Sequence, residues 1–74
     1  SEKVVGLKQV RRAVTGGSVN LVFLACDADP RLTEALEELC KEHGVATVWD
    51  YTMAQLGKAC GIAVGTAAAA VAVK

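Results

Sequence analysis

This sequence predicts a compact α/β sandwich in which strands and helices alternate along one domain. Seventy-four residues leave room for a single domain, residues 1–74, and 53% of them are hydrophobic. Apolar residues recur three and four apart in two segments, as on one face of a helix, whereas "VNLVFLAC" is a continuous apolar run. The resulting order, β-α-β-α-β-α-β, is typical of helices packed against a sheet.

The first third of the chain predicts two strands and one helix. Lys3–Val5 can form a short strand, and Gly6 then begins a helix over about residues 7–15. The apolar stripe of that helix consists of Leu7, Val10 and Val14. The run "VNLVFLAC", residues 19–26, is rich in Val, Leu and Phe and fits a strand buried on both faces.

A second helix begins at Asp29-Pro30, where Asp29 is the N-cap and Pro30 occupies the first helical position. Its predicted inner stripe consists of Leu32, Leu36, Leu39 and Cys40. Its acidic outer face is exposed to solvent, and Gly44 ends the helix.

The last third predicts a strand, a short helix and an ambiguous tail. "VATVW" reads as a strand, and Thr52-Met53-Ala54-Gln55 matches a capping box that opens a helix ending at Cys60. Alanine favours helices, but the tail "GTAAAAVAVK" follows Gly65 and ends in alternating Val and Ala. We expect a strand there.

Charge is distributed unevenly although the formal net charge is zero. Residues 1–20 carry four basic side chains against one acid, whereas residues 21–50 carry seven acids against two basic side chains. Such asymmetry favours a one-sided contact with a polyanion. Lys8, Arg11 and Arg12 stand near the start of the first helix, where the helix dipole disfavours cations, and such a cost indicates a functional site.

Other kinds of site have little support in the sequence. The three cysteines lack C-x-x-C spacing, which predicts buried reduced thiols and no metal, and there is no nucleotide-binding glycine motif, so no cofactor is expected. Asp27 and Asp29 follow a buried strand, as in some phosphoryl-transfer sites, but no motif completes such a site and turn or capping roles explain both. His43 reads as structural. No apolar run is long enough for a membrane span.

Three stretches resemble the kink-turn RNA-binding ribosomal-protein family often called L-seven-Ae. They are "VVGLKQVRRAVTGGSVNLVFLACDADP", "LTEALEELC" and "LGKACGIAVGTAAAAVAV", and the small bacterial, YbxF-like branch is the most similar. The resemblance implies a three-layer α/β/α sandwich around a mixed four-stranded sheet, with the Ala-rich tail as a strand. It implies a non-catalytic, cytoplasmic RNA-binding protein, ribosome-associated and monomeric, with the family's N-terminal helix largely missing before Lys3.

The resemblance also implies which residues contact RNA. Members of the family insert a Gly-x-Asn-Glu-x-x-Lys segment into the widened groove beside tandem sheared G·A pairs. The matching residues here are Gly6, Lys8, Gln9 and Arg12, with Arg11 beside them. Asp29 matches an acid near a looped-out base. The segment that packs on the looped-out nucleotides corresponds to Lys58, Ala59, Cys60, Gly61, Ile62, Ala63 and Val64.

Gln9 departs from the glutamate of the archaeal and eukaryotic pattern. A glutamine both donates and accepts hydrogen bonds, whereas an ionised glutamate only accepts, so the base contact would be shared differently. An alternative function also stays open, a ribosome-assembly or protein-interaction module that uses the acidic helix over residues 30–43. The natural RNA target does not follow from the sequence.

Overall fold

The computed structural model describes residues 2–73, which form four short strands and three helices. Along the chain these are β1 Lys3–Val5, α1 Leu7–Thr15, β2 Leu21–Leu24, α2 Pro30–Glu42, β3 Ala46–Val48, α3 Met53–Ala59 and β4 Ala68–Val71. The predicted order is therefore confirmed. Among residues 2–73, no helix is both long and apolar enough to cross a bilayer.

The strands form one mixed sheet in the order β1-β4-β2-β3. β4 runs antiparallel to both of its neighbours, whereas β2 and β3 are parallel. The Ala-rich tail is thus a central strand, as the resemblance implied. The helix propensity of alanine is overridden because β4 is paired with a strand on each side. Ala70, for example, lies opposite Val22 of β2 on one side and opposite Val4 of β1 on the other.

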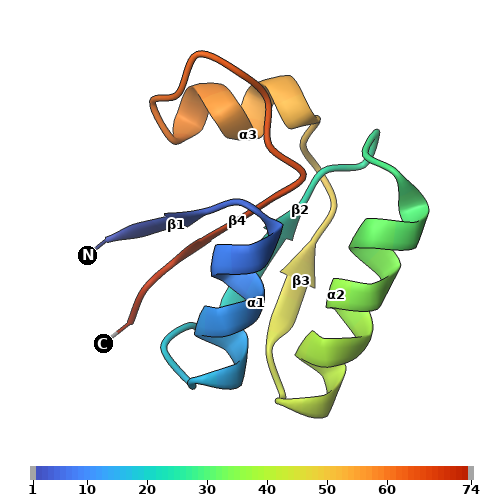
Figure 1. The fold of residues 1–74 in the computed structure, drawn as a ribbon, viewed down its shortest axis with the longest axis vertical. Helices are drawn as coiled ribbons and strands as arrows, with labels where there is room; N and C mark the ends of the chain where they lie inside the picture. The colour runs from blue at the N-terminus through green and yellow to red at the C-terminus, as the bar shows by residue number, and fades with distance from the viewer. Residues whose placement is uncertain (1, 74) are drawn as a thin grey trace.

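The helices lie on both faces of this sheet, which makes the three-layer sandwich (Figure 1). α1 and α2 pack against each other and against one face, and the core between them includes Val10, Val22, Leu24, Leu36 and Ala70. Side chains alternate along a strand, so Phe23, Ala69 and Val71 face α3 on the other side. α3 covers only part of that face, and Phe23 is half-buried rather than fully enclosed.

All three helices begin at the same end of the sheet, which is the end where β1, β2 and β3 finish. Each follows the carboxyl end of a strand, and β1, β2 and β3 end at the edge where the antiparallel β4 begins. Two backbone hydrogen bonds close this edge: Gly6 N–H donates to the Ala68 carbonyl over 3.0 Å, and Ala25 N–H to the Ala67 carbonyl over 2.9 Å. The start of α1, the start of α2 and the segment before β4 are therefore neighbours.

Two predictions of burial are wrong. On α2 the fully buried residues are Thr33, Leu36 and Cys40, whereas Leu32 is 50% exposed. Thr33 tolerates burial because its hydroxyl donates to the Asp29 carbonyl over 3.4 Å, so the helix can turn this face inward. β2 is shorter than the predicted 19–26 and only one of its faces is fully covered, because the face toward α3 stays half-open.

Candidate nucleic-acid interface

Gly6 sets the geometry at the start of α1. Its φ of 100° lies in the region that side chains rarely adopt, and a Cβ there would lie 2.7 Å from Oε1 of Gln9. The carbonyl of Gly6 accepts from the Val10 N–H over 2.9 Å and so closes the first helical turn. Gly6 therefore allows β1 to turn directly into α1 with the Gln9 amide folded back beside the turn.

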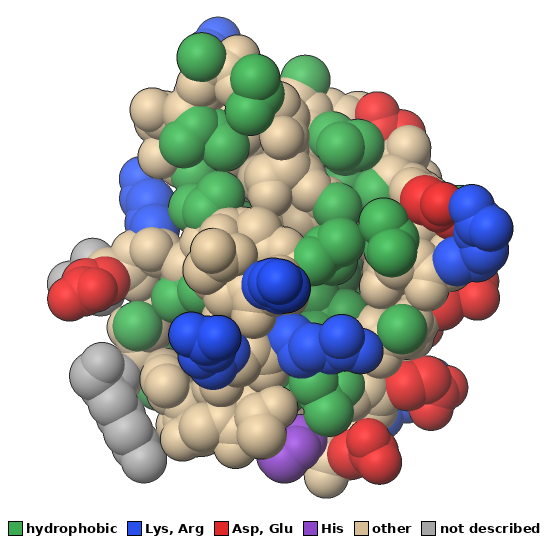
Figure 2. All heavy atoms as spheres, in the orientation of Figure 1, with side chains coloured by type: hydrophobic (Ala, Val, Ile, Leu, Met, Phe, Trp, Pro, Cys, Tyr) green, Lys and Arg blue, Asp and Glu red, His purple; other side chains and the backbone are tan. Residues whose placement is uncertain are grey.

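The cations of α1 are exposed and have no ion-pair partner among residues 2–73. Lys8, Gln9, Arg11 and Arg12 are all exposed, whereas Val10 and Val14 point into the core. The first turn has no acidic residue and no side-chain cap. Within residues 2–73 the one ion pair joins Arg31 to Asp29, so these cations are available to an external anion. Figure 2 shows Lys and Arg side chains gathered over α1, beside an apolar strip.

The position of Arg12 corrects the sequence interpretation. α1 spans only nine residues, and Arg12 lies in its last turn, where a cation suits the helix dipole. The unfavourable cation of the first turn is Lys8 alone, because Arg11 lies one turn further along.

The segment Lys58–Val64 presents apolar side chains to solvent. Ile62 is 38% and Val64 71% exposed, and the two lie close together on this one segment. Backbone bonds hold the segment on α3: Ile62 N–H donates to the Gly57 carbonyl over 3.0 Å, and Thr66 N–H to the Met53 carbonyl over 3.2 Å. The segment is thus a defined apolar surface on α3, and the chain that follows it reaches the start of α1 at Ala68, whose carbonyl accepts from the Gly6 N–H.

Asp29 is already engaged within its own helix. Its Oδ1 accepts from the Arg31 backbone N–H over 3.0 Å and from Arg31 Nε over 3.2 Å, and its Oδ2 accepts from Nη2 over 2.9 Å. The side chain of Arg31 and then its backbone N–H lower the pKa of Asp29 below its ordinary value. Asp29 caps α2 as predicted, and its carboxylate and the Arg31 guanidinium lie together at the start of that helix.

Asp27 has a structural role that its position alone did not reveal. Its Oδ1 accepts from the Met53 N–H over 2.8 Å, so it satisfies a free donor at the start of α3. In residues 2–73 no three His, Cys, Asp or Glu side chains gather in a way that could hold a metal ion. The hydrogen bond from the Met53 N–H therefore gives Asp27 a structural role at the start of α3.

The cysteines differ in environment. Cys40 is fully buried, and desolvation together with the charge of Glu37 raises the pKa of its thiol. Cys60 is half-buried, whereas Cys26 is exposed in the turn that follows β2. The prediction of buried thiols is therefore wrong for Cys26.

Sequence reasoning missed a small hollow between α1 and α2. It has a volume of about 120 Å³, and Lys8 and Arg11 lie on one side of it with Arg31 and Leu32 on the other. The position of Arg31, two residues after the aspartate that caps α2, was the feature of the sequence that could have pointed to it. The hollow extends the basic surface of α1 to the start of α2.

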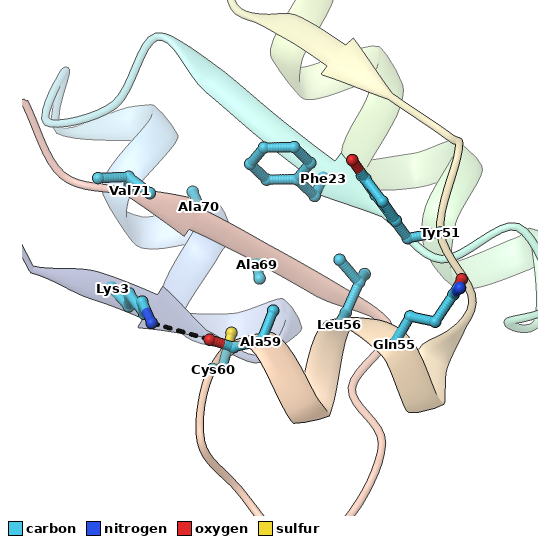
Figure 3. Close-up of a pocket in the computed structure, with 10 residues that line it drawn as sticks. All are labelled: Lys3, Phe23, Tyr51, Gln55, Leu56, Ala59, Cys60, Ala69, Ala70 and Val71. Atoms are coloured by element: carbon cyan, nitrogen blue, oxygen red, sulfur yellow. Dashed lines mark hydrogen bonds between the residues drawn. The ribbon is translucent and has the colours of Figure 1, made fainter.

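A larger apolar cavity of about 380 Å³ lies between α3 and the sheet (Figure 3). Phe23 and Tyr51 form one wall, with ring centroids 6.0 Å apart in an edge-to-face arrangement. At the other end Lys3 Nζ donates to the Ala59 carbonyl over 2.8 Å. The space is left because β4 contributes alanines to this layer. Of the predicted RNA-contact residues only Ala59 and Cys60 line it, so it is largely separate from the basic surface.

Fold and surface together define a small α/β/α sandwich with exposed cations along α1 and an exposed apolar segment after α3. Comparison with known proteins gives this class a family. Residues 2–74 match the model of the ribosomal protein L7Ae/L30e/S12e/Gadd45 family. The chain belongs to that family, which is non-catalytic and of the ribosomal-protein type, and it is an RNA-binding protein.

Individual relatives agree with this assignment. An RNA-binding protein of Caldanaerobacter subterraneus is 42% identical over 69 residues, which cover 93% of this chain and 84% of the relative. The RNA-binding protein YbxF of Geobacillus stearothermophilus is 40% identical over 68 residues, covering 92% and 83%. The structure of the Giardia lamblia 15.5kD RNA binding protein superposes with a TM-score of 0.88 at 30% identity, covering 97% of this chain and 61% of that protein. The resemblance to the YbxF-like branch is confirmed.

Proposed function

We propose that this protein recognises kink-turn RNA, in which tandem sheared G·A pairs adjoin looped-out nucleotides, as a ribosome-associated protein of the bacterial cytoplasm. One observation carries the proposal: α1 presents exposed cations that have no ion-pair partner within residues 2–73, and it begins at the end of the sheet to which the apolar segment Lys58–Val64 leads through Thr66 and Ala67. Residues 1–74 then act as a single, monomeric RNA-binding domain.

The geometry of RNA explains why the bound form is kinked. The major groove of regular A-form RNA is too deep and narrow for side chains to read. A helix start can enter only where a kink widens the groove. In this proposal Lys8 and Gln9, in the first turn of α1, meet guanine edges there, while Arg11 and Arg12 neutralise phosphates further along the helix.

The apolar segment gives the second half of recognition. Single-stranded nucleotides are bound by packing their exposed bases on apolar or aromatic side chains. Ile62, Ala63 and Val64 are exposed, and Gly61 has a φ of 75°, so the chain turns sharply just before them. We assign this segment, with Lys58, Ala59 and Cys60, to the looped-out nucleotides, and Asp29 to the corner next to them.

The experiment is a titration of the protein with a kink-turn duplex and with the same duplex lacking its bulge. Tighter binding of the bulged RNA by at least tenfold is expected, and equal affinities would contradict the proposal. Ribosome association is tested separately, by following the protein through a sucrose gradient of cell extract at low and high salt.

The same titration separates the alternative function. If α2 instead bound a protein partner through its acidic face, reversing Glu38 to Lys would abolish that interaction and leave RNA affinity nearly unchanged. Reversing Lys8 to Glu would do the opposite. Both side chains are exposed, so neither change disturbs the core.

A further inference from the structure

We propose that the hollow between α1 and α2 is a second phosphate-binding surface for the RNA, and that Arg31 is its third cation. This inference rests on the proposed function and extends the contact surface from α1 to the start of α2. Three cations border the hollow, Lys8 and Arg11 from α1 and Arg31 from α2, and none of the described residues that line it is acidic.

The arrangement of Arg31 suits a phosphate. The guanidinium group has five N–H donors, and two of them bond to the carboxylate of Asp29. Three donors are therefore left for another anion. Because Asp29 holds the group from one side, less side-chain freedom is lost when a phosphate binds to the other. The side chain is 89% exposed, so an RNA strand can reach it.

The floor of the hollow favours a nucleic-acid strand over a free ion. Leu7, Leu32 and Leu36 line it, and half of the Leu32 side chain is exposed. An inorganic phosphate gains nothing from such a floor, whereas a nucleotide brings a sugar and a base beside its phosphate. Lys8, which borders the hollow, also belongs to the proposed base-reading turn of α1, so both contacts can be made by one continuous strand.

The test compares the salt dependence of kink-turn RNA binding by the wild-type protein, Arg31→Ala, Arg31→Lys and the control Lys41→Ala. Each phosphate contact contributes about −0.7 (single strand) to −0.9 (duplex) to the slope of log affinity against log salt. Arg31→Ala should make the slope shallower by about one unit. Arg31→Lys should restore the slope, because the charge returns. Lys41, exposed in the last turn of α2, should be silent.

A second set of variants tests the position of the hollow independently of Arg31. Leu32→Glu should weaken RNA binding and Leu32→Lys should strengthen it, with Leu32→Gln between them. All three should fold, since Leu32 is half-exposed at the start of α2, and melting curves check this. Ethylation interference should place the affected phosphates at one site on the RNA.

Each outcome is decisive. If wild type prefers kinked RNA but the Arg31 and Leu32 variants keep its affinity and slope, the hollow is not an RNA surface and the proposed function still stands. If the wild-type protein does not prefer kinked RNA, the proposed function itself fails, and the titration of the wild-type protein shows this without any variant.

Discussion

The carbonyl oxygen of Val64 lies against the α-carbon of Gly57, so a side chain at position 57 has no space. A Cβ there would also lie 3.0 Å from the Cα of Gly65. Gly57 is buried within α3, which means that the apolar segment after the helix returns to touch the helix itself. The shape of the proposed nucleotide-contact surface therefore depends on residue 57 being a glycine.

Gly57→Ala should displace this segment and weaken both folding and RNA binding. Overpacking of this kind costs about 1–3 kcal/mol, more than the gain from replacing glycine by alanine in a helix. The measurements are the free energy of unfolding and the affinity for kink-turn RNA. Ala54→Gly is the control, since it loosens an exposed position of α3 without touching the segment. Its RNA affinity should stay at the wild-type level, and a Gly57→Ala protein that binds normally would refute the role of the close contact.

Arg12→Ala and Gln9→Ala should separate phosphate neutralisation from base recognition. With three or four phosphates neutralised, log affinity should fall against log salt with a slope of about −2 to −4. Arg12→Ala should make the slope shallower by about one unit and weaken all kinked RNAs equally. Gln9→Ala should keep the slope and lose about 1–3 kcal/mol of preference for the G·A-containing site.

Neither variant should unfold the protein, because both side chains are exposed on α1. Arg12 lies in the last turn, so its removal should not stabilise the helix, in contrast to what a first-turn position would predict. Unchanged slope and affinity in Arg12→Ala would mean that the basic surface of α1 is only solvated.

The ion pair of Asp29 and Arg31 should make the stability of the fold depend on pH in the acid range. Because the folded state lowers the pKa of Asp29 below its ordinary 3.8, the pair stabilises the fold above that pH. The contribution is lost as the pH falls through the lowered folded-state pKa. Wild type should therefore melt above Asp29→Asn at neutral pH, and the difference should vanish in strong acid.

NMR titration of the Asp29 carboxyl group gives the direct measurement for this pair. Its pKa should rise toward the ordinary value in Arg31→Ala and stay low in Lys41→Ala, since Lys41 is at the other end of α2. An Asp29 pKa that does not respond to Arg31 would show that the ion pair does not persist in solution.

The three thiols should react in the order of their exposure. Cys26 is exposed and should be modified first, Cys60 more slowly, and Cys40 only on unfolding, because burial both blocks access and raises the pKa of its thiol. A thiol reagent followed by mass spectrometry gives the order. RNA affinity should not change with a chelator, and stoichiometric zinc in the purified protein would contradict this account of the cysteines.

The parts of the fold that local chemistry specifies were predictable. The capping box is present as expected, with Thr52 Oγ1 accepting from Gln55 N–H over 3.2 Å and Gln55 Oε1 accepting from Thr52 N–H over 2.9 Å. The N-caps Gly6 and Asp29 could likewise be predicted from the few residues around each of them. These signals fix where helices begin, whatever the rest of the protein does.

The errors concern residues whose state depends on distant neighbours. The bond from Met53 to Asp27 spans 26 residues, and no local pattern announces it. Leu32 was expected in the inner stripe of α2 but is 50% exposed, whereas Thr33 is buried, because an apolar stripe is too broad to specify which of two neighbouring residues faces the sheet. Arg31 was overlooked for the same reason: its relation to Lys8 and Arg11 exists only once α1 and α2 are side by side.

The most direct test of the central claim is the conformation of the RNA itself. The probe is a kink-turn duplex with a fluorescent donor and acceptor on its two arms, used in a magnesium-free buffer chosen so that the free RNA transfers energy inefficiently. A protein that binds only the kinked form must shift the RNA toward it. Titration without magnesium should therefore raise transfer efficiency to a saturating plateau, and a duplex with its G·A pairs replaced should show no rise. Saturable binding with unchanged transfer efficiency would contradict recognition of the kink.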